Sequence, residues 1–240
     1  MKLYLWSRSR LKQGNRQCDL TRHDIRVGEV YPSLTDRRKR VSKKMIEDFR
    51  PRVRRYFKWA FFATIAGPLS IVLHEIGHAM MALAVGYSMI RIRFHSVDRI
   101  APADIQPWER ALTSEAGSIA SLVIVLLCCL IIQNRRHSIF AKAMGMVAAV
   151  QFTGGLIYVV SAVFGAVPPT NFDGARFAQY LNIPIFFPAL VESLLLICSW
   201  IYIIGFINSS ERKMAVLGVI SGGALGIVIW LTLLGPFLLP

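Results

Sequence analysis

The residues SIVLHEIGHAMMALAVG, numbers 70–86, place three ionisable side chains inside an apolar run. The run extends back to about Tyr56, and about 20 apolar residues in a helix are enough to cross a bilayer. An ionisable residue inside such a helix costs roughly 2.5 kcal/mol or more, so these residues are rare there without a function. His74, Glu75 and His78 all fall in this run. The stretch therefore predicts a membrane helix that carries a functional site.

The rest of the chain repeats the apolar pattern. Of its 240 residues, 54% are hydrophobic and only 18% are charged, whereas soluble domains average about 25% charged residues. Because only helices or closed barrels satisfy the backbone in lipid, we expect an all-α polytopic membrane protein. The five predicted spans run approximately from Tyr56 to Gly86, Leu112 to Gln133, Ile139 to Val167, Ile185 to Asn208 and Met214 to Leu239.

Positive charge is concentrated before the first span. Residues 1–55 hold 17 of the 28 Lys and Arg residues and six acids, which gives a net charge of +11 out of +14 for the whole chain. We therefore predict a basic extramembrane arm over residues 1–55 and a membrane domain over residues 56–240. The run Arg37–Arg40 predicts contact between this arm and anionic lipid headgroups. No nucleic-acid partner is expected.

Three smaller features complete the pattern. The length of the first span predicts a tilt or a break near Gly67–Pro68. Alternation over Ile90–Val97 predicts a short strand at the membrane surface. In the last span, small residues recur every four positions and predict close helix packing; they are Gly218, Gly222 and Gly226. The four cysteines show no metal-binding spacing and are interpreted as structural thiols.

The motif HEIGH, residues 74–78, has the spacing of a zinc site. Residues four apart lie on the same face of a helix, so His74 and His78 can hold one Zn²⁺. Glu75 can then reach a water molecule on the metal and act as general base. The alternative is a hydrogen-bonded polar cluster that only ties helices together. Three ionisable groups so close together in lipid favour the metal.

Two histidines leave such a site short of a protein ligand, because catalytic zinc usually has three. Asp173 follows the third predicted span, and the first and third spans run in the same direction, so Asp173 can meet the HEIGH segment at one membrane face. Glu115, at the start of the second span, lies on that face as well. His95 is also on that side. The order of the spans leaves all three as candidates.

The motifs together resemble those of the site-2 protease family of intramembrane zinc proteases. The resemblance consists of HEIGH in the first core helix, Glu115-Ala116-Gly117-Ser118 opening the second, and Phe172-Asp173-Gly174 after a proline. It covers about residues 57–180 and implies a three-helix core with accessory helices at about 185–239. It also implies that Asp173 is the third ligand. The predicted strand is similar to the family's membrane-surface β element, which can pair with an unwound substrate.

The chain departs from the family pattern around the third ligand. Pro168 matches the family's proline, five residues before Asp173. Gly165 stands where the family usually has Asn, Phe172 replaces Leu, and Thr170 replaces a second proline. Asn171 is a candidate to supply the missing polar group. These differences concern substrate handling more than metal binding.

The resemblance implies a zinc metalloendopeptidase with one Zn²⁺ per chain, bound by His74, His78 and Asp173, and with Glu75 as the catalytic residue. Its substrate would be a membrane-anchored protein, cleaved in or near a transmembrane segment. The alternative is a non-catalytic zinc-binding protein of the same fold that binds a membrane partner. Only five histidines are present, which is too few for a di-iron lipid hydroxylase.

Location and orientation follow from different arguments. We expect a multi-pass protein of the bacterial cytoplasmic membrane, with an organellar membrane as the alternative. The positive-inside rule places the basic arm and the loop Asn134–Lys142 in the cytoplasm and the zinc site toward the opposite face. The family resemblance implies the reverse orientation. Both orientations remain open at this point.

Overall fold

The computed structural model describes residues 34–239, with side chains from residue 49 onward. The chain divides into two units, residues 1–44 and 45–240, and the apolar helices lie in the second unit. The division into an arm (1–55) and a membrane domain (56–240) stays a prediction, as does lipid contact by Arg37–Arg40. Of the four cysteines, Cys18 lies outside the described residues. Cys128, Cys129 and Cys198 are free thiols.

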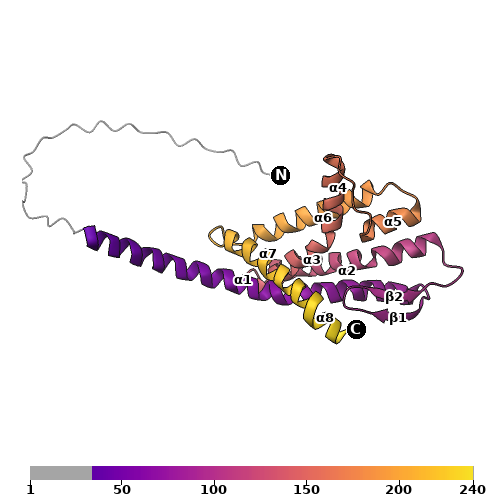
Figure 1. Ribbon diagram of the computed structural model, residues 1–240, viewed down its shortest axis with the longest axis horizontal. Coiled ribbons are helices and arrows are strands. Elements are labelled where there is room, and N and C mark those ends of the chain that lie inside the picture. Colours follow the sequence, from indigo (N-terminus) through magenta and orange to yellow (C-terminus); the bar gives the residue numbers. More distant parts are fainter. Residues whose placement is uncertain (1–33, 240) are drawn as a thin grey trace, which may run out of the picture. The chain divides into compact units, whose positions relative to one another are not determined.

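Helices dominate the described part of the chain, and one small hairpin accompanies them (Figure 1). The elements are α1 (Leu34–Ala84), β1 (Ser88–Ile92), β2 (Val97–Ile100), α2 (Pro107–Asn134), α3 (Ile139–Ala149), η1 (Val150–Phe152), α4 (Thr153–Val163), α5 (Asp173–Leu181), α6 (Phe186–Gly205), α7 (Arg212–Ile229), η2 (Trp230–Leu234) and α8 (Gly235–Leu238). Five stretches are long and apolar enough to cross a membrane: Phe49–Ala84, Pro107–Asn134, Ile139–Val163, Phe186–Gly205 and Arg212–Leu238. The prediction of an all-α fold with five spans is confirmed, and the chain is an integral membrane protein that crosses the bilayer several times.

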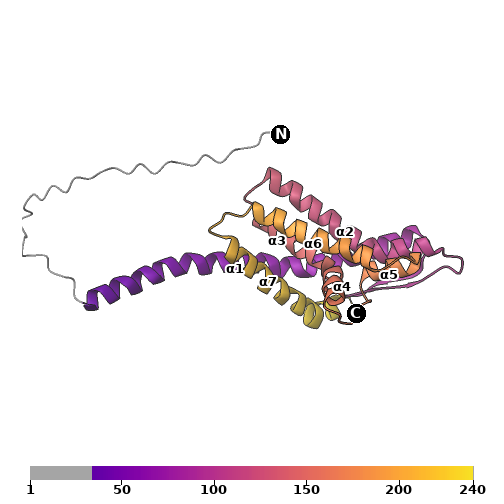
Figure 2. The same ribbon diagram turned by 90° about the horizontal axis from the view of Figure 1, so that it is seen from above.

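The second unit has two distinct ends (Figure 2). The helices α1 and α2 lie alongside each other, and the β1–β2 hairpin and α5 lie at the end where α1 stops and α2 begins. At the other end α2 and α6 stop while α3 and α7 begin, and the loops that join them contribute to one cavity. The membrane domain therefore has a hairpin face and an opposite face.

Of the tilt or break predicted near Gly67–Pro68, the break is absent, because α1 continues through both residues. A proline cannot donate a hydrogen bond to the carbonyl four residues earlier, here that of Thr64. A Cβ atom on Gly226 would lie 2.3 Å from the Thr64 oxygen. Because Gly226 has no side chain, its Cα lies close to this carbonyl, which has no hydrogen bond from Pro68. In membrane proteins, neighbouring helices contact backbone groups of this kind. α7 therefore packs closely against α1 at the turn that precedes the proline.

The glycine stripe of α7 forms the predicted close contact. A Cβ on Gly218 would lie 2.8 Å from the Trp59 side chain, and one on Gly222 would lie 2.2 Å from the backbone oxygen of Ala60. Trp59, 2% exposed, belongs to the buried core that this contact helps to close. The stripe therefore docks α7 against α1 and has a packing role.

Two other predicted elements need correction. The third span is interrupted by η1 and stops at Val163, not at Val167. The predicted single strand 90–97 is an antiparallel hairpin, with Arg91 opposite Asp98. Its turn is closed by the backbone N–H of Arg93, which donates to the Ser96 carbonyl at 2.8 Å. The alternation of residue types continued through this turn, which is why it resembled one strand.

Candidate metal centre

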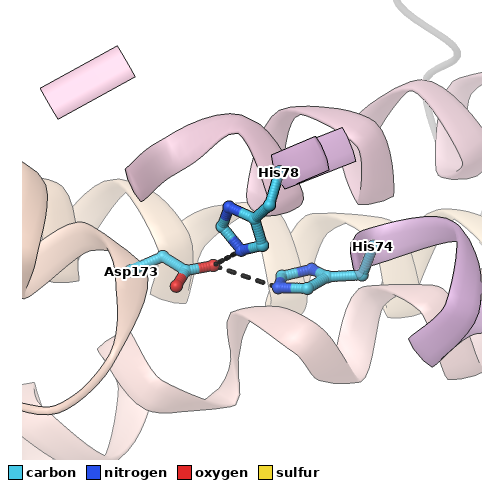
Figure 3. A group of neighbouring side chains, drawn as sticks. All are labelled: His74, His78 and Asp173. Atoms are coloured by element: carbon cyan, nitrogen blue, oxygen red, sulfur yellow. Dashed lines mark ion pairs between the residues drawn. The ribbon is translucent and has the colours of Figure 1, made fainter. Parts of the chain in front are cut away.

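Three side chains from two separate helices converge at the hairpin face (Figure 3). Both histidines project from α1, and Asp173 is the first residue of α5. The Oδ2 atom of Asp173 lies 3.1 Å from Nε2 of His74 and 3.3 Å from Nε2 of His78. One ligand atom from each residue lies within 4.8 Å of the other two. The three predicted ligands are thus brought together in a group that could hold a metal ion.

The spacing suits a tetrahedral ion. Zinc ligands lie about 2.0–2.2 Å from the metal, so two ligands at tetrahedral angles lie about 3.3 Å from each other. The two nitrogen–oxygen distances in this group are 3.1 and 3.3 Å. These two distances therefore match those between ligands of one tetrahedral ion, and all three ligand atoms lie within 4.8 Å of one another.

Hydrogen bonds orient both imidazole rings. Nδ1 of His78 donates to the backbone oxygen of Thr113 at 2.9 Å, and Nδ1 of His74 lies 3.1 Å from the hydroxyl of Ser121. With its proton on Nδ1, a neutral imidazole presents only a lone pair at Nε2. In that tautomer the two lone pairs are free to bind a metal ion, whereas in the metal-free protein a ring protonated at Nε2 donates to the Asp173 carboxylate. A hydrogen-bond partner on the ring nitrogen that does not face the metal accompanies most metal-binding histidines.

The charge on Asp173 depends on the same contacts. Burial would raise the pKa of its carboxyl group, but hydrogen bonds from His74 and His78 hold that pKa well below its usual range. Ser118 adds a longer hydroxyl contact of 3.5 Å to Oδ2. The group is therefore an anion at neutral pH, as a metal ligand must be.

Gly117 of α2 makes room for the group. A Cβ atom on this residue would lie 2.4 Å from Nε2 of His74 and 2.4 Å from Nε2 of His78. Any side chain there would occupy the position where the two imidazoles meet the carboxylate. Gly77 likewise allows α1 to approach Ala116 of α2, because its Cβ would lie 2.6 Å from that residue's oxygen. Both glycines are therefore needed for the geometry.

A buried carboxylate fixes the start of α5. Glu192 of α6, 3% exposed, accepts hydrogen bonds from the backbone N–H of Gly174 at 3.2 Å and of Gly155 at 3.0 Å. Both N–H groups belong to the first turns of helices, where they have no partner within their own helix. The negative charge also favours these positive helix ends. Glu192 thereby holds the backbone next to Asp173, a role that sequence reasoning did not identify.

Glu75 lies beside the group and lines the same cavity. The cavity has a volume of about 390 Å³, and its wall includes Glu75, His95 and Asn171. Arg99 and Arg176 also line it. Neither arginine pairs with a carboxylate within the described part of the chain. The cavity thus has a potential general base on one side and cationic groups on another.

The other two candidate ligands lie outside the three-residue group. His95 lines the cavity from the turn of the hairpin. Glu115 is an interior residue of α2, not its first, because α2 begins at Pro107. One of its carboxylate oxygens is buried without a hydrogen-bond partner in the described residues. The geometry favours Asp173 over both, although ligation itself stays a prediction.

Gly165, which departs from the family pattern, and Asn171, the candidate to supply the missing polar group, lie in different surroundings. Gly165 adopts a left-handed φ of 69° just after α4. The N–H of Gly165 donates to Ala162 and that of Ala166 donates to Ser161, which is the Schellman pattern that ends a helix. A Cβ at position 165 would meet nothing within 4 Å. Asn171, by contrast, lines the cavity.

Comparisons of the chain with models of known families, with curated proteins and with solved structures found no match. The fold and the site define an integral membrane protein with a buried His–His–Asp group that could bind a metal ion.

Proposed function

We propose that the protein is an intramembrane zinc metalloprotease that hydrolyses a peptide bond in or near a transmembrane segment of another protein. The observation that carries the proposal is the convergence of His74, His78 and Asp173 beside Glu75, at one end of a membrane domain. The resemblance of the HEIGH and Phe-Asp-Gly motifs to the site-2 protease family supports the same reading. The metal would be one Zn²⁺ per chain.

The donor set fits zinc. Two imidazole nitrogens and one carboxylate oxygen form a known catalytic combination, which leaves a fourth position open for water or substrate. A zinc ion held there supplies a Lewis acid that polarises the scissile carbonyl and lowers the pKa of water. His74, His78 and Asp173 would hold the ion. Ser121 and the Thr113 carbonyl would keep both rings turned toward it.

Glu75 would transfer a proton from the attacking water to the leaving amine. It follows the first histidine in the motif, lines the cavity beside all three ligands and is only 8% exposed. We propose that its carboxylate takes a proton from the attacking water and passes it to the leaving amine. The substrate helix would have to unwind locally, because its carbonyls are otherwise bound within the helix. The exposed edges of the β1–β2 hairpin would pair with the unwound segment.

The test is cleavage of a membrane-anchored reporter by purified protein in lipid. We expect the wild type to cleave it and Glu75→Gln to lose at least about a hundredfold in rate, as for a general base, while retaining zinc. Equal rates for the two proteins would contradict the role of Glu75. Zinc retention without cleavage of any membrane-anchored substrate by the wild type would favour the alternative, a non-catalytic zinc protein that binds a membrane partner.

A further inference from the structure

A second cavity lies at the face opposite the hairpin. It has a volume of about 930 Å³ and is lined by the loops that connect α2 to α3 and α6 to α7, by the adjoining ends of α3, α6 and α7, and by Lys58 and Trp59 of α1. Its charged lining residues are four cations and one acid, namely Lys58, Arg136, Lys142, Arg212 and Glu211, and its neutral polar ones are His137, Asn208 and Ser209. The proposed protease mechanism uses none of these residues.

Within the described part of the chain, cationic side chains outnumber acids in the lining of this cavity. The only carboxylate among these described lining residues, Glu211, pairs with Arg55 outside the cavity at 3.4 Å. Lys142 is 6% exposed, and its ammonium group donates to two backbone oxygens, those of Arg136 at 2.6 Å and Phe206 at 2.8 Å. A lysine ammonium carries three donors, so one N–H remains. Four cationic side chains thus line the cavity with a single acid, an excess of positive charge that favours a bound anion.

The cavity lies at the level of the membrane surface. Four apolar helices begin or end around it, so it belongs to the boundary between lipid and water. Lys58 precedes His74 by 16 residues in α1, which corresponds to about 24 Å along the helix axis. The cavity is therefore separate from the candidate metal centre and opens where lipid headgroups lie.

We infer that this cavity binds a phosphate group, supplied by the headgroup of an anionic phospholipid. Arginine matches phosphate oxygens in a bidentate geometry, and Arg136 and Arg212 are both exposed on the cavity wall. Basic pockets between membrane helices are suited to such headgroups. The volume lies within the range of small-molecule sites, about 300–1,000 Å³. A soluble phosphate shares this chemistry, but the position of the cavity favours the lipid.

Native mass spectrometry of the full-length protein in detergent tests the inference. The probes are phosphatidylglycerol and phosphatidylcholine with identical acyl chains. We expect the wild type to retain one phosphatidylglycerol with at least about tenfold preference over phosphatidylcholine. Each cation near an anionic headgroup contributes about fivefold in affinity. The double variant Arg136→Gln/Arg212→Gln should therefore lose most of the preference, and Lys58→Gln, which leaves both arginines in place, provides an independent second variant with a smaller loss.

The control removes two exposed arginines at the hairpin face, Arg91→Gln/Arg110→Gln, and should keep the wild-type preference. An equal preference in the wild type and both cavity variants would overturn the inference. Inorganic phosphate serves as the competing probe. Its displacement of phosphatidylglycerol from the wild type at millimolar concentration would assign the cavity to a soluble phosphate compound and overturn the lipid assignment.

Discussion

Gly117 lies so close to His74 that a Cβ atom on the glycine would be 2.4 Å from the imidazole Nε2, and the same distance separates it from Nε2 of His78. This contact explains why a glycine in α2 belongs to a site whose proposed ligands come from α1 and α5. Small changes in bond length cannot relieve such an overlap, so a methyl group added at Gly117 must displace one of the two imidazole rings.

Gly117→Ala is therefore expected to weaken zinc binding although every proposed ligand is retained. Loss of ligand orientation typically costs tenfold to a hundredfold in metal affinity, and we expect a loss in that range. Competition with a fluorescent chelator measures it. The matched control is Gly205→Ala, because a Cβ there would meet nothing within 4 Å. Equal affinities for the two alanine variants would contradict the proposed geometry.

Glu192→Gln should loosen the start of α5. The amide would present its NH₂ group to one of the two backbone N–H groups that the carboxylate now binds. Leaving that N–H buried without an acceptor costs about 1–3 kcal/mol. We expect a lower thermal midpoint together with weaker zinc binding, since Asp173 adjoins the affected N–H. Glu109→Gln, at the start of α2, should leave zinc affinity unchanged.

Gly222→Ala should destabilise the contact between α7 and α1. Its Cβ would lie 2.2 Å from the backbone oxygen of Ala60, whereas a Cβ on Gly223 would lie an ordinary 3.5 Å from Val147. Overpacking of this kind costs about 1–3 kcal/mol. Thermal unfolding in detergent should therefore separate Gly222→Ala from its neighbour Gly223→Ala. Similar midpoints for both would mean that α7 does not dock through the glycine stripe.

Removal of the metal should lower the stability of the wild type. A ligand that binds only the folded state adds about 2.7 kcal/mol at a hundred times its Kd. Dialysis against a chelator should reduce the thermal midpoint of the wild type and leave that of His74→Ala nearly unchanged, because the variant has little metal to lose. An identical decrease in both proteins would show that the chelator acts elsewhere.

The sequence predicted the spans and the pairing of His74 with His78 because apolar length and helical spacing are local properties. For the third ligand the order of the spans left Asp173, Glu115 and His95 open, and only the family resemblance implied Asp173. It could not predict the roles of Glu192 and Ser121, since each depends on contacts between residues far apart in the chain. Of the predicted tilt or break near Pro68, the break is absent, and the close approach of Gly226 to this part of α1 could not be predicted because Gly226 lies in another helix. The hairpin was read as one strand because its turn continues the alternation of its strands.

The most direct test of the metal centre is zinc content measured by mass spectrometry on purified protein. We expect about one zinc per chain in the wild type and a large loss in Asp173→Ala. Asp98→Ala, which removes an exposed carboxylate of the hairpin that pairs with Arg93, should retain the wild-type content. Unchanged zinc content in Asp173→Ala would contradict the proposed ligand set and direct attention to Glu115 or His95.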